Sequence, residues 1–360
     1  MIKPSKTFKI LAGLSALALA AGGSAFGAET AEAGDLNMLI WEGYADEDVT
    51  KAWEEATGCT ITRTYVGSND EFPAKLAAGA APYDVITPSI DTTSIMRKAG
   101  FVEPIDISKL EHWDEIYEKF RNLDPQTTYE GEVWGMPYTW GSIPLMYRTD
   151  KVSGPLSFAD LWTNEEVAGS ISLWDDKTSL YITARMLYGK DINVYDMSDE
   201  QLGEVVAKLI ELKPKLRKFW ATAGELINLY ANGEVVISNT WGGYQSAEVQ
   251  KQGIDIVEYI PVENADGWQD DWQIVKGHSE NPCVYQWLNF ASGPEGQCGV
   301  VGVTGYSAAN PVAIKECVSE ERFLELHQDD PDYIDSLDFW REPARVDAYI
   351  NAWNSVKAAQ

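Results

Sequence analysis

Apolar positions from Leu36 onward alternate between the two-residue period of strands and the longer period of helices. The pattern predicts strands at 36–41, 59–66 and 83–88, and helices at 47–57, 71–80 and 91–100. Gly58 and Gly100 follow the first and third helices, where glycine commonly ends a helix. Asp91 or Thr92 is the expected N-cap of the third helix. A strict strand–helix alternation predicts a mostly parallel α/β sheet.

The residue composition changes in the middle of the chain. Residues 133–147, VWGMPYTWGSIPLMY, are rich in Gly, Pro and aromatic side chains, and we expect strands here that cross between two lobes. Later strands are expected at 170–174, 234–239, 254–260 and 272–275, and later helices at 178–188, 199–212, 224–232, 282–291 and from Pro343 onward. The chain is longer than one hydrophobic core usually serves, so two lobes are expected.

The first residues have the composition of a signal peptide. Lys3, Lys6 and Lys9 precede the short apolar run ILAGLSALALAAGG, and small residues follow it. This order predicts a signal peptide at 1–28 and export of the rest of the chain. In an exported chain, four cysteines permit two disulfides with three possible pairings, which the sequence leaves open. The cysteines are Cys59, Cys283, Cys298 and Cys317.

Charge and motif content narrow the function classes. The formal net charge of −28 repels nucleic acid and anionic membrane surfaces and attracts cations. The three histidines are far apart and the cysteines lack metal-binding spacing, so neither a metal nor a cofactor is expected. The sequence contains no GxSxG, HExxH, P-loop or GxGxxG motif. These observations favour a binding protein over an enzyme.

Aromatic and acidic residues recur where predicted strands end. Trp41, Ser89, Trp241 and the segment Trp174–Asp176 each follow a strand candidate, and WQDDW lies at 268–272. Ligands of open α/β sheets gather at the carboxyl ends of strands. Aromatic faces beside carboxylates suit an organic ammonium group. Three alternatives remain: packing of single tryptophans in the core, an aromatic platform for sugars, and a carbohydrate-active enzyme that uses Asp175/Asp176 or Asp270/Asp271 as paired acids.

The chain resembles periplasmic solute-binding proteins of ABC importers, of the spermidine/putrescine-binding family. The resemblance spans nearly the whole mature length and rests on the order of LIWEGY, YDVITPS, WGMPYTWGSIPLMY, NTWGGYQSA, GWQDDWQI and TGYSAANP. It implies a two-lobed, type II-like fold in which each lobe is a mixed sheet flanked by helices, joined by crossing hinge strands. The implied lobes are 35–141 plus 270–314 and 142–269 plus 315–360.

The resemblance also implies a set of ligand-binding residues. Those that match the family pattern are Trp41, Glu42, Tyr44, Ser89, Asp176, Trp241, Trp268, Asp270 and Tyr306. Asp176 and Asp270 would hold ammonium groups, and the tryptophans would clamp the aliphatic chain of the ligand. Two further candidates depart from the pattern: Asp91 stands where the family has a tyrosine, and Arg341 where it has a glutamine. Ser179 replaces a second carboxylate.

The departures leave two ligand classes open. A polyamine of the putrescine/spermidine type is the first expectation. If Arg341 faces the ligand, a zwitterionic amine such as an ω-amino acid or a taurine-like aminosulfonate fits better, because an arginine forks onto carboxylate or sulfonate and repels a second ammonium. The resemblance further implies a periplasmic monomer that delivers its solute to an ABC transporter permease.

Overall fold

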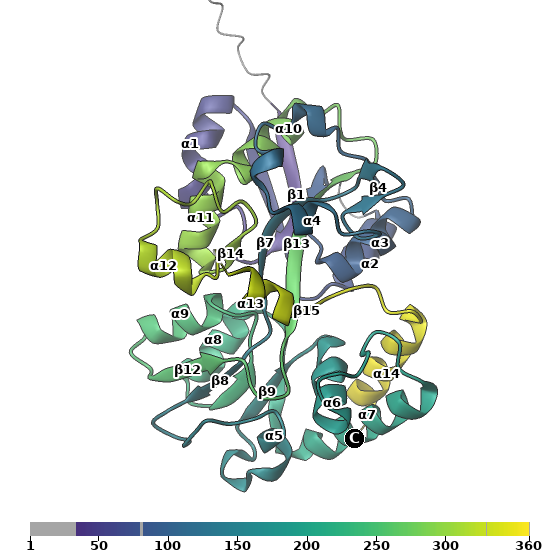
Figure 1. Cartoon of the computed structure of the whole chain (residues 1–360), viewed down its shortest axis with the longest axis vertical. Helices are drawn as coiled ribbons and strands as arrows, with labels where there is room; N and C mark the ends of the chain where they lie inside the picture. The colour runs from purple at the N-terminus through teal and green to yellow at the C-terminus, as the bar shows by residue number, and fades with distance from the viewer. Residues whose placement is uncertain (1–33, 80–81, 329, 360) are drawn as a thin grey trace, which may run out of the picture. The chain divides into compact units, whose positions relative to one another are not determined.

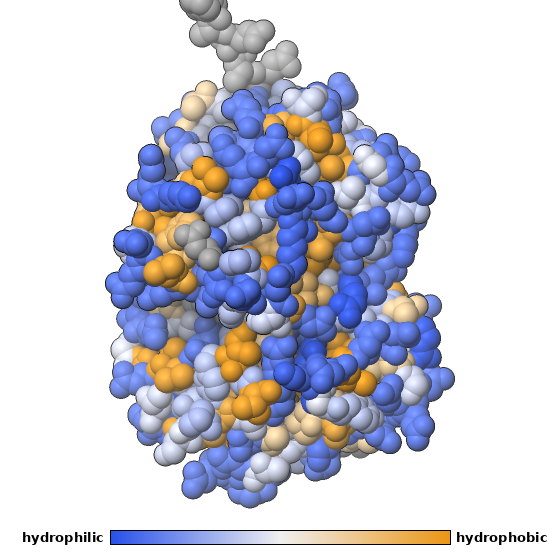
Figure 2. Space-filling view, viewed as in Figure 1, coloured by the Kyte–Doolittle hydropathy of each residue, from blue (hydrophilic) through white to orange (hydrophobic). Residues whose placement is uncertain are grey.

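The computed structural model describes residues 34–79, 82–328 and 330–359, all of which fall in one compact unit (Figure 1). The predicted signal peptide at 1–28 lies outside the described residues. No helix in the described part of the chain has the length and apolar character needed to cross a membrane. Hydrophilic residues cover most of the face in Figure 2, and the hydrophobic ones there form small, separate groups.

An eight-stranded mixed sheet forms the framework of the first lobe. Its central order is β14-β7-β13-β3-β1-β2, and β4 and β15 also pair with β13. The strands are Asp35–Trp41 (β1), Thr60–Val66 (β2), Val85–Ile86 (β3), Val102–Glu103 (β4), Met136–Ser142 (β7), Asp266–Val275 (β13), Ser307–Ala308 (β14) and Asp338–Phe339 (β15). β1 runs parallel to β2 and β3, but β13 runs antiparallel to β3, β4 and β7. The expectation of a mostly parallel sheet was therefore wrong: the parallel pattern ends where β13 returns.

The helices of the first lobe are Glu47–Thr57 (α1), Glu71–Ala78 (α2), Ile90–Lys98 (α3), Glu118–Arg121 (α4), Pro282–Ser292 (α10) and Pro294–Thr304 (α11). Four of them, α1, α2, α3 and α10, begin and end close to the predicted positions, whereas α4 and α11 were not predicted. The Asp46 side chain caps the start of α1. Gly58 ends this helix with a φ of 74°, as the sequence predicts. The predicted N-cap of α3 was wrong, because Ser89 holds the extended conformation before the helix and Asp91 lies inside it.

A five-stranded sheet of order β10-β9-β11-β8-β12 forms the framework of the second lobe. Its strands are Leu145–Arg148 (β8), Ile171–Trp174 (β9), Leu216–Trp220 (β10), Ile237–Asn239 (β11) and Ile256–Tyr259 (β12). The helices around it are Asp160–Thr163 (α5), Thr178–Tyr188 (α6), Asp199–Leu212 (α7), Ala223–Ala231 (α8), Tyr244–Lys251 (α9) and Val346–Ala358 (α14). Helix α7 starts with a capping box of Ser198 and Gln201.

The remaining elements are short. They are the hairpin Thr128–Tyr129 (β5) and Glu132–Val133 (β6), the helices Glu320–Glu325 (α12) and Pro331–Ser336 (α13), and 3₁₀ turns at Ile107–Lys109, Trp113–Glu115, Glu165–Val167 and Lys213–Lys215. The chain passes between the two large sheets at 143–144 and at 260–265. The predicted boundaries of the lobes stay a prediction.

Two disulfides resolve the pairing that the sequence left open. Cys59 is bonded to Cys283 and Cys298 to Cys317. The first bond joins the segment before β2 to α10 across 224 residues, whereas the second closes a loop of 19. In chain-entropy terms the longer closure restricts the unfolded chain more.

Candidate functional site

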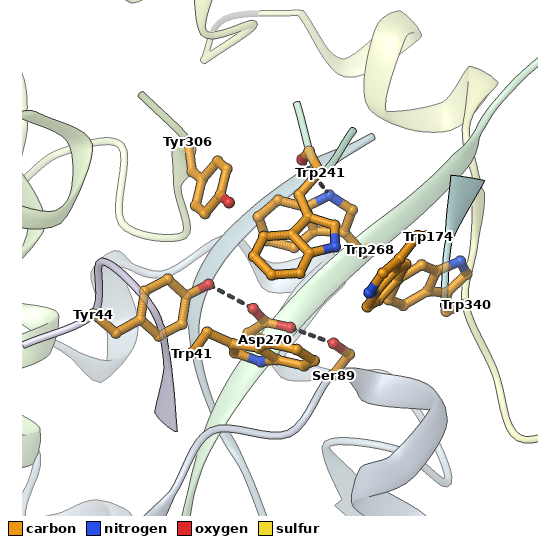
Figure 3. Close-up of a pocket in the computed structure, with 9 residues that line it drawn as sticks. All are labelled: Trp41, Tyr44, Ser89, Trp174, Trp241, Trp268, Asp270, Tyr306 and Trp340. Atoms are coloured by element: carbon orange, nitrogen blue, oxygen red, sulfur yellow. Dashed lines mark hydrogen bonds between the residues drawn. The ribbon is translucent and has the colours of Figure 1, made fainter. Parts of the chain in front are cut away.

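A pocket lies where strand ends of the two lobes meet (Figure 3). It is lined by Trp41, Tyr44, Ser89, Trp174, Trp241, Trp268, Asp270, Tyr306 and Trp340, and its empty space of about 280 Å³ includes space open to solvent. The first lobe contributes the end of β1, the residue before α3 and the early part of β13. The second lobe contributes the end of β9 and the loop after β11. The pocket thus depends on both lobes being in place.

Asp270 provides the only carboxylate among the residues that line this pocket. Its Oδ1 accepts a hydrogen bond of 2.6 Å from the Ser89 hydroxyl, and its Oδ2 accepts one of 2.5 Å from the Tyr44 hydroxyl. Figure 3 shows the carboxylate between these two donors. In the described residues no Lys, Arg or His forms an ion pair with it. Burial raises the pKa of the Asp270 carboxyl to about 7, with small additions from Asp271 and Asp91 and opposition from the two hydrogen bonds.

Tryptophan rings form the walls around this carboxylate. The Trp41 ring is edge-on to those of Trp174 and Trp241, with centroids 6.2 and 5.6 Å away. The Trp174 ring stacks on Trp340 at 6.0 Å. Aromatic faces carry negative potential, so a group of rings around one acid is a favourable setting for a cation.

Hydrogen bonds and a glycine fix the position of the Trp268 ring. The indole N–H donates a hydrogen bond of 2.9 Å to the Trp241 carbonyl. The indole ring packs edge-on against the Tyr306 ring, with centroids 4.7 Å apart. A Cβ at Gly141, on the paired strand β7, would lie 2.6 Å from the Trp268 ring. Only glycine therefore allows β7 to approach this indole so closely.

Two tyrosines complete the pocket. The Tyr44 hydroxyl also contacts the hydroxyl of Thr139 on β7. Burial, followed by the nearby Asp270 carboxylate, holds the pKa of both Tyr44 and Tyr306 well above the usual value. Both phenols therefore stay neutral, and the Tyr44 hydroxyl acts as a hydrogen-bond donor to Asp270 rather than as a counter-charge.

The structure brings seven of the eleven predicted residues together and places four elsewhere. Trp41, Tyr44, Ser89, Trp241, Trp268, Asp270 and Tyr306 line the pocket. The Glu42 carboxylate instead accepts a hydrogen bond of 3.3 Å from the Gly224 N–H, because successive side chains after β1 point to different sides.

The other three predicted residues have partners of their own. Asp91 forms an ion pair with Lys177, and Asp176 accepts hydrogen bonds from the N–H and hydroxyl of Thr178. Arg341 pairs with Asp338 at 2.9 Å and lies over the Tyr195 ring. None of the three lines the pocket.

Two lining residues are absent from the predicted set. Trp174 ends β9, and its position at a strand end is a signal that the sequence already contains. Trp340 follows β15 and directly precedes Arg341. The resemblance pointed to Arg341 as a site residue and not to its neighbour Trp340. The indole N–H of Trp174 donates to the Gly67 carbonyl of the first lobe at 3.0 Å. Trp174 therefore contributes both to the pocket wall and to the contact between lobes.

The described residues contain no group of three or more His, Cys, Asp or Glu side chains that could hold a metal ion. The chemistry that the pocket offers is one buried carboxylate, neutral hydroxyl donors and aromatic faces. Two α/β lobes that meet at such a pocket define a class of protein: one that takes up a small solute between its lobes.

Comparison with known proteins identifies the family. Residues 48–323 match the model of the bacterial extracellular solute-binding protein family, and the chain belongs to that family. The spermidine/putrescine-binding periplasmic protein of Escherichia coli K12 is 30% identical over 308 residues, which cover 82% of this chain and 84% of the relative. The putrescine-binding periplasmic protein PotF of the same strain is 27% identical over 336 residues, covering 87% and 88%.

Solved structures agree with this family. The spermidine/putrescine ABC transporter substrate-binding protein PotD of Streptococcus pneumoniae has a TM-score of 0.70 at 25% identity, over 90% of this chain and 98% of that one. The binding protein MotA of A. tumefaciens B6, solved with glucopine, has a TM-score of 0.73 at 19% identity, over 90% and 99%, and supports the fold alone. The two-lobed fold predicted from the sequence is thereby confirmed.

Proposed function

We propose that this chain is the periplasmic solute-binding component of an ABC importer, and that it captures a small amine-bearing solute between its lobes. A polyamine of the putrescine or spermidine type is the first candidate, because relatives over most of the chain carry these solutes in their names. The protein acts as a monomer that delivers its solute to a membrane permease. It binds without breaking a bond.

One observation carries the proposal: Asp270 is buried among tryptophan rings with neutral donors only. A buried carboxylate without a counter-charge is costly, and a ligand ammonium would supply that charge. The ammonium would also face the rings, and cation–π attraction strengthens when the cation is desolvated. The aliphatic chain of a small amine would pack on Trp41 and Trp241, which suits the limited volume of the pocket.

The zwitterion alternative receives no support from Arg341. Its guanidinium is engaged by Asp338 and by the Tyr195 ring, outside the pocket. No Lys, Arg or His is among the residues that line the pocket. A carboxylate or sulfonate of the ligand would therefore meet Asp270 without a cation to balance it.

The paired-acid alternative is disfavoured by geometry. Asp270 faces the pocket, whereas Asp271 accepts hydrogen bonds from Gln269 and Thr127 on the other side of β13. Asp175 accepts a hydrogen bond from the Trp353 indole and lies 3.3 Å from Lys357. Neither pair can place two acids on either side of one scissile bond, as glycoside hydrolysis requires.

Calorimetric titration tests the proposal. The mature protein is titrated with putrescine, spermidine, γ-aminobutyrate, taurine and maltose, and an Asp270→Asn variant serves as the matched control. We expect heat of binding with an amine, and loss of that signal in Asp270→Asn. Binding of maltose alone, or of an amine with equal affinity in the variant, would refute an ammonium site at Asp270.

A further inference from the structure

A buried ion pair links the two lobes close to the pocket. Lys177 immediately precedes α6 in the second lobe, and Asp91 is the second residue of α3 in the first. The Lys177 ammonium lies 2.9 Å from Oδ2 of Asp91, and the two side chains are only 6% and 2% exposed. Any separation of the lobes would break this contact, because each partner belongs to a different sheet system.

Further acids surround the same ammonium. Oδ1 of Asp70 lies 4.0 Å from it. Asp176 uses Oδ1 to accept two hydrogen bonds from Thr178, while its buried Oδ2 has no hydrogen-bond donor among the described residues. Burial alone would lower the pKa of Lys177, but Asp91, Asp176 and Asp70 hold it well above the usual value. The ammonium is therefore charged at neutral pH and is the local counter-ion of this acidic group.

This acidic group borders the proposed ligand site. Asp91 comes two residues after Ser89, which donates to Asp270, and Asp176 comes two residues after Trp174. The Asp91 carboxylate is near enough to contribute to the raised pKa of Asp270. Next to the pocket thus lie two buried carboxylates and one lysine ammonium, which is paired with Asp91.

We propose that Lys177 is a specificity-determining residue whose ammonium occupies the acidic side of the cleft, so that the pocket binds solutes through one ammonium group, held by Asp270. The inference rests on the proposed function and narrows it. A solute with a second ammonium gains little at Asp91 or Asp176, because the Lys177 ammonium already lies among these acids and like charges repel. The same contact draws the lobes together without any ligand.

Two solutes of equal chain length can show whether a second ammonium group contributes to binding. n-Butylamine and putrescine share a four-carbon chain, and putrescine adds one ammonium group. Calorimetric titration of the wild-type protein should give dissociation constants that differ by less than about tenfold, because the Lys177 ammonium repels a second ammonium beside Asp91 and Asp176. In Lys177→Met the acids lose their counter-ion, and preference for putrescine over n-butylamine should rise by about tenfold or more.

A matched control is available on α7. Lys208 pairs with Glu211 on the helix surface, away from the cleft, and Lys208→Met should leave the ratio of the two constants unchanged. The double variant Lys177→Met/Asp91→Asn removes both partners of the buried pair. It should show a smaller preference for putrescine than Lys177→Met alone.

The outcomes separate the two proposals. If neither amine binds the wild-type protein, the proposed function fails. If both bind and the wild-type protein already prefers putrescine by more than about tenfold, the role of Lys177 is overturned while the proposed function stands. The wild-type ratio decides even if Lys177→Met does not fold. If that variant folds, a ratio that rises by less than tenfold also overturns the inference.

Discussion

Each half of the segment Trp268–Gln273, WQDDWQ, contains one tryptophan, one glutamine and one aspartate, yet the tryptophan and aspartate of the two halves have different surroundings. Trp268 and Asp270 alternate along β13 and both line the pocket. Asp271 and Trp272 are fully buried and contact only protein: Asp271 binds Gln269 and Thr127, and Trp272 packs on Tyr138 and Trp287. Residues of the same kind, adjacent in sequence, thus divide between a pocket wall and the core.

The two carboxylates show what this division means energetically. Both accept two hydrogen bonds from neutral donors, and burial raises both pKa values, to about 7 for Asp270 and about 6 for Asp271. Asp271 is enclosed by the protein, and a Cβ at Gly135 would lie 2.5 Å from its carboxylate. Asp270 borders empty space. Only Asp270 therefore has room for a cation from outside.

The largest effects are expected when either tryptophan of this segment, Trp268 or Trp272, is replaced by alanine. Trp272→Ala should lower the free energy of unfolding by about 3–5 kcal/mol, because a fully buried indole leaves a cavity among Tyr138 and Trp287. Trp268→Ala should cost less stability, since its ring borders a pocket, but should weaken amine binding by about tenfold. Denaturant unfolding and calorimetric titration measure the two effects. Equal losses of affinity in both variants would contradict the assignment of Trp268 to the pocket and of Trp272 to the core.

The second effect concerns pH. A carboxyl whose folded pKa is raised from 3.8 to about 7 favours the folded state when protonated, so its stabilising effect is lost as pH rises through that window. Without ligand, Asp270→Asn should therefore gain stability over the wild type between pH 4 and 7, up to roughly 4 kcal/mol. For Asp271→Asn the gain should level off near pH 6. Denaturant unfolding at a series of pH values measures the stability differences of both variants. Parallel curves of unfolding free energy against pH for the wild type and Asp270→Asn would disprove the raised pKa of Asp270.

The third effect is on affinity. Asp270→Asn keeps the shape of the side chain but removes the charge that a ligand ammonium needs, so affinity should fall by about thirty- to a hundredfold, roughly 2–3 kcal/mol. Asp271→Asn is the matched control and should bind as the wild type does. Titration with the tightest amine decides the matter. A drop in Asp271→Asn as large as that in Asp270→Asn would mean that the loss comes from the strand and not from the site.

The smallest effect concerns the donors. Ser89→Ala removes the 2.6 Å hydrogen bond to Asp270 and should weaken binding by about 1 kcal/mol, since the carboxylate is less well oriented. Thr127→Ala removes the corresponding donor to Asp271 and should lower stability by a similar amount with affinity unchanged. The same pair of titration and unfolding experiments reports both. An affinity loss in Thr127→Ala alone would reverse the roles of the two acids.

Much of the fold follows from local sequence pattern. The predicted helices at 47–57, 178–188 and 199–212 coincide with α1, α6 and α7, because apolar residues recur there at helical spacing; side chains also cap the start of α1 and α7. Helix α11 was not predicted, since its sequence PEGQCGVVGVT is rich in glycine and β-branched residues with low helix propensity. The antiparallel return of β13 has no local signal, because pairing is decided by contacts far apart in sequence.

For the site as well, some residues could be predicted from local sequence pattern and others could not. Strand-end tryptophans such as Trp41 and Trp241 could be predicted, because the carboxyl ends of strands are where ligands collect. Which of Asp270 and Asp271 faces the pocket depends on the register of β13, which shifts between these residues in its pairing with β7. The Lys177–Asp91 pair joins residues of different lobes, and no spacing rule connects them.

A crystal structure of the mature protein with putrescine would show whether Asp270 holds a ligand ammonium. We expect electron density for the ligand in the pocket of Figure 3, with an ammonium nitrogen about 2.7–2.9 Å from a carboxylate oxygen of Asp270 and the alkyl chain on the Trp41 and Trp241 rings. Putrescine bound elsewhere, or bound here with both nitrogens away from Asp270, would contradict it.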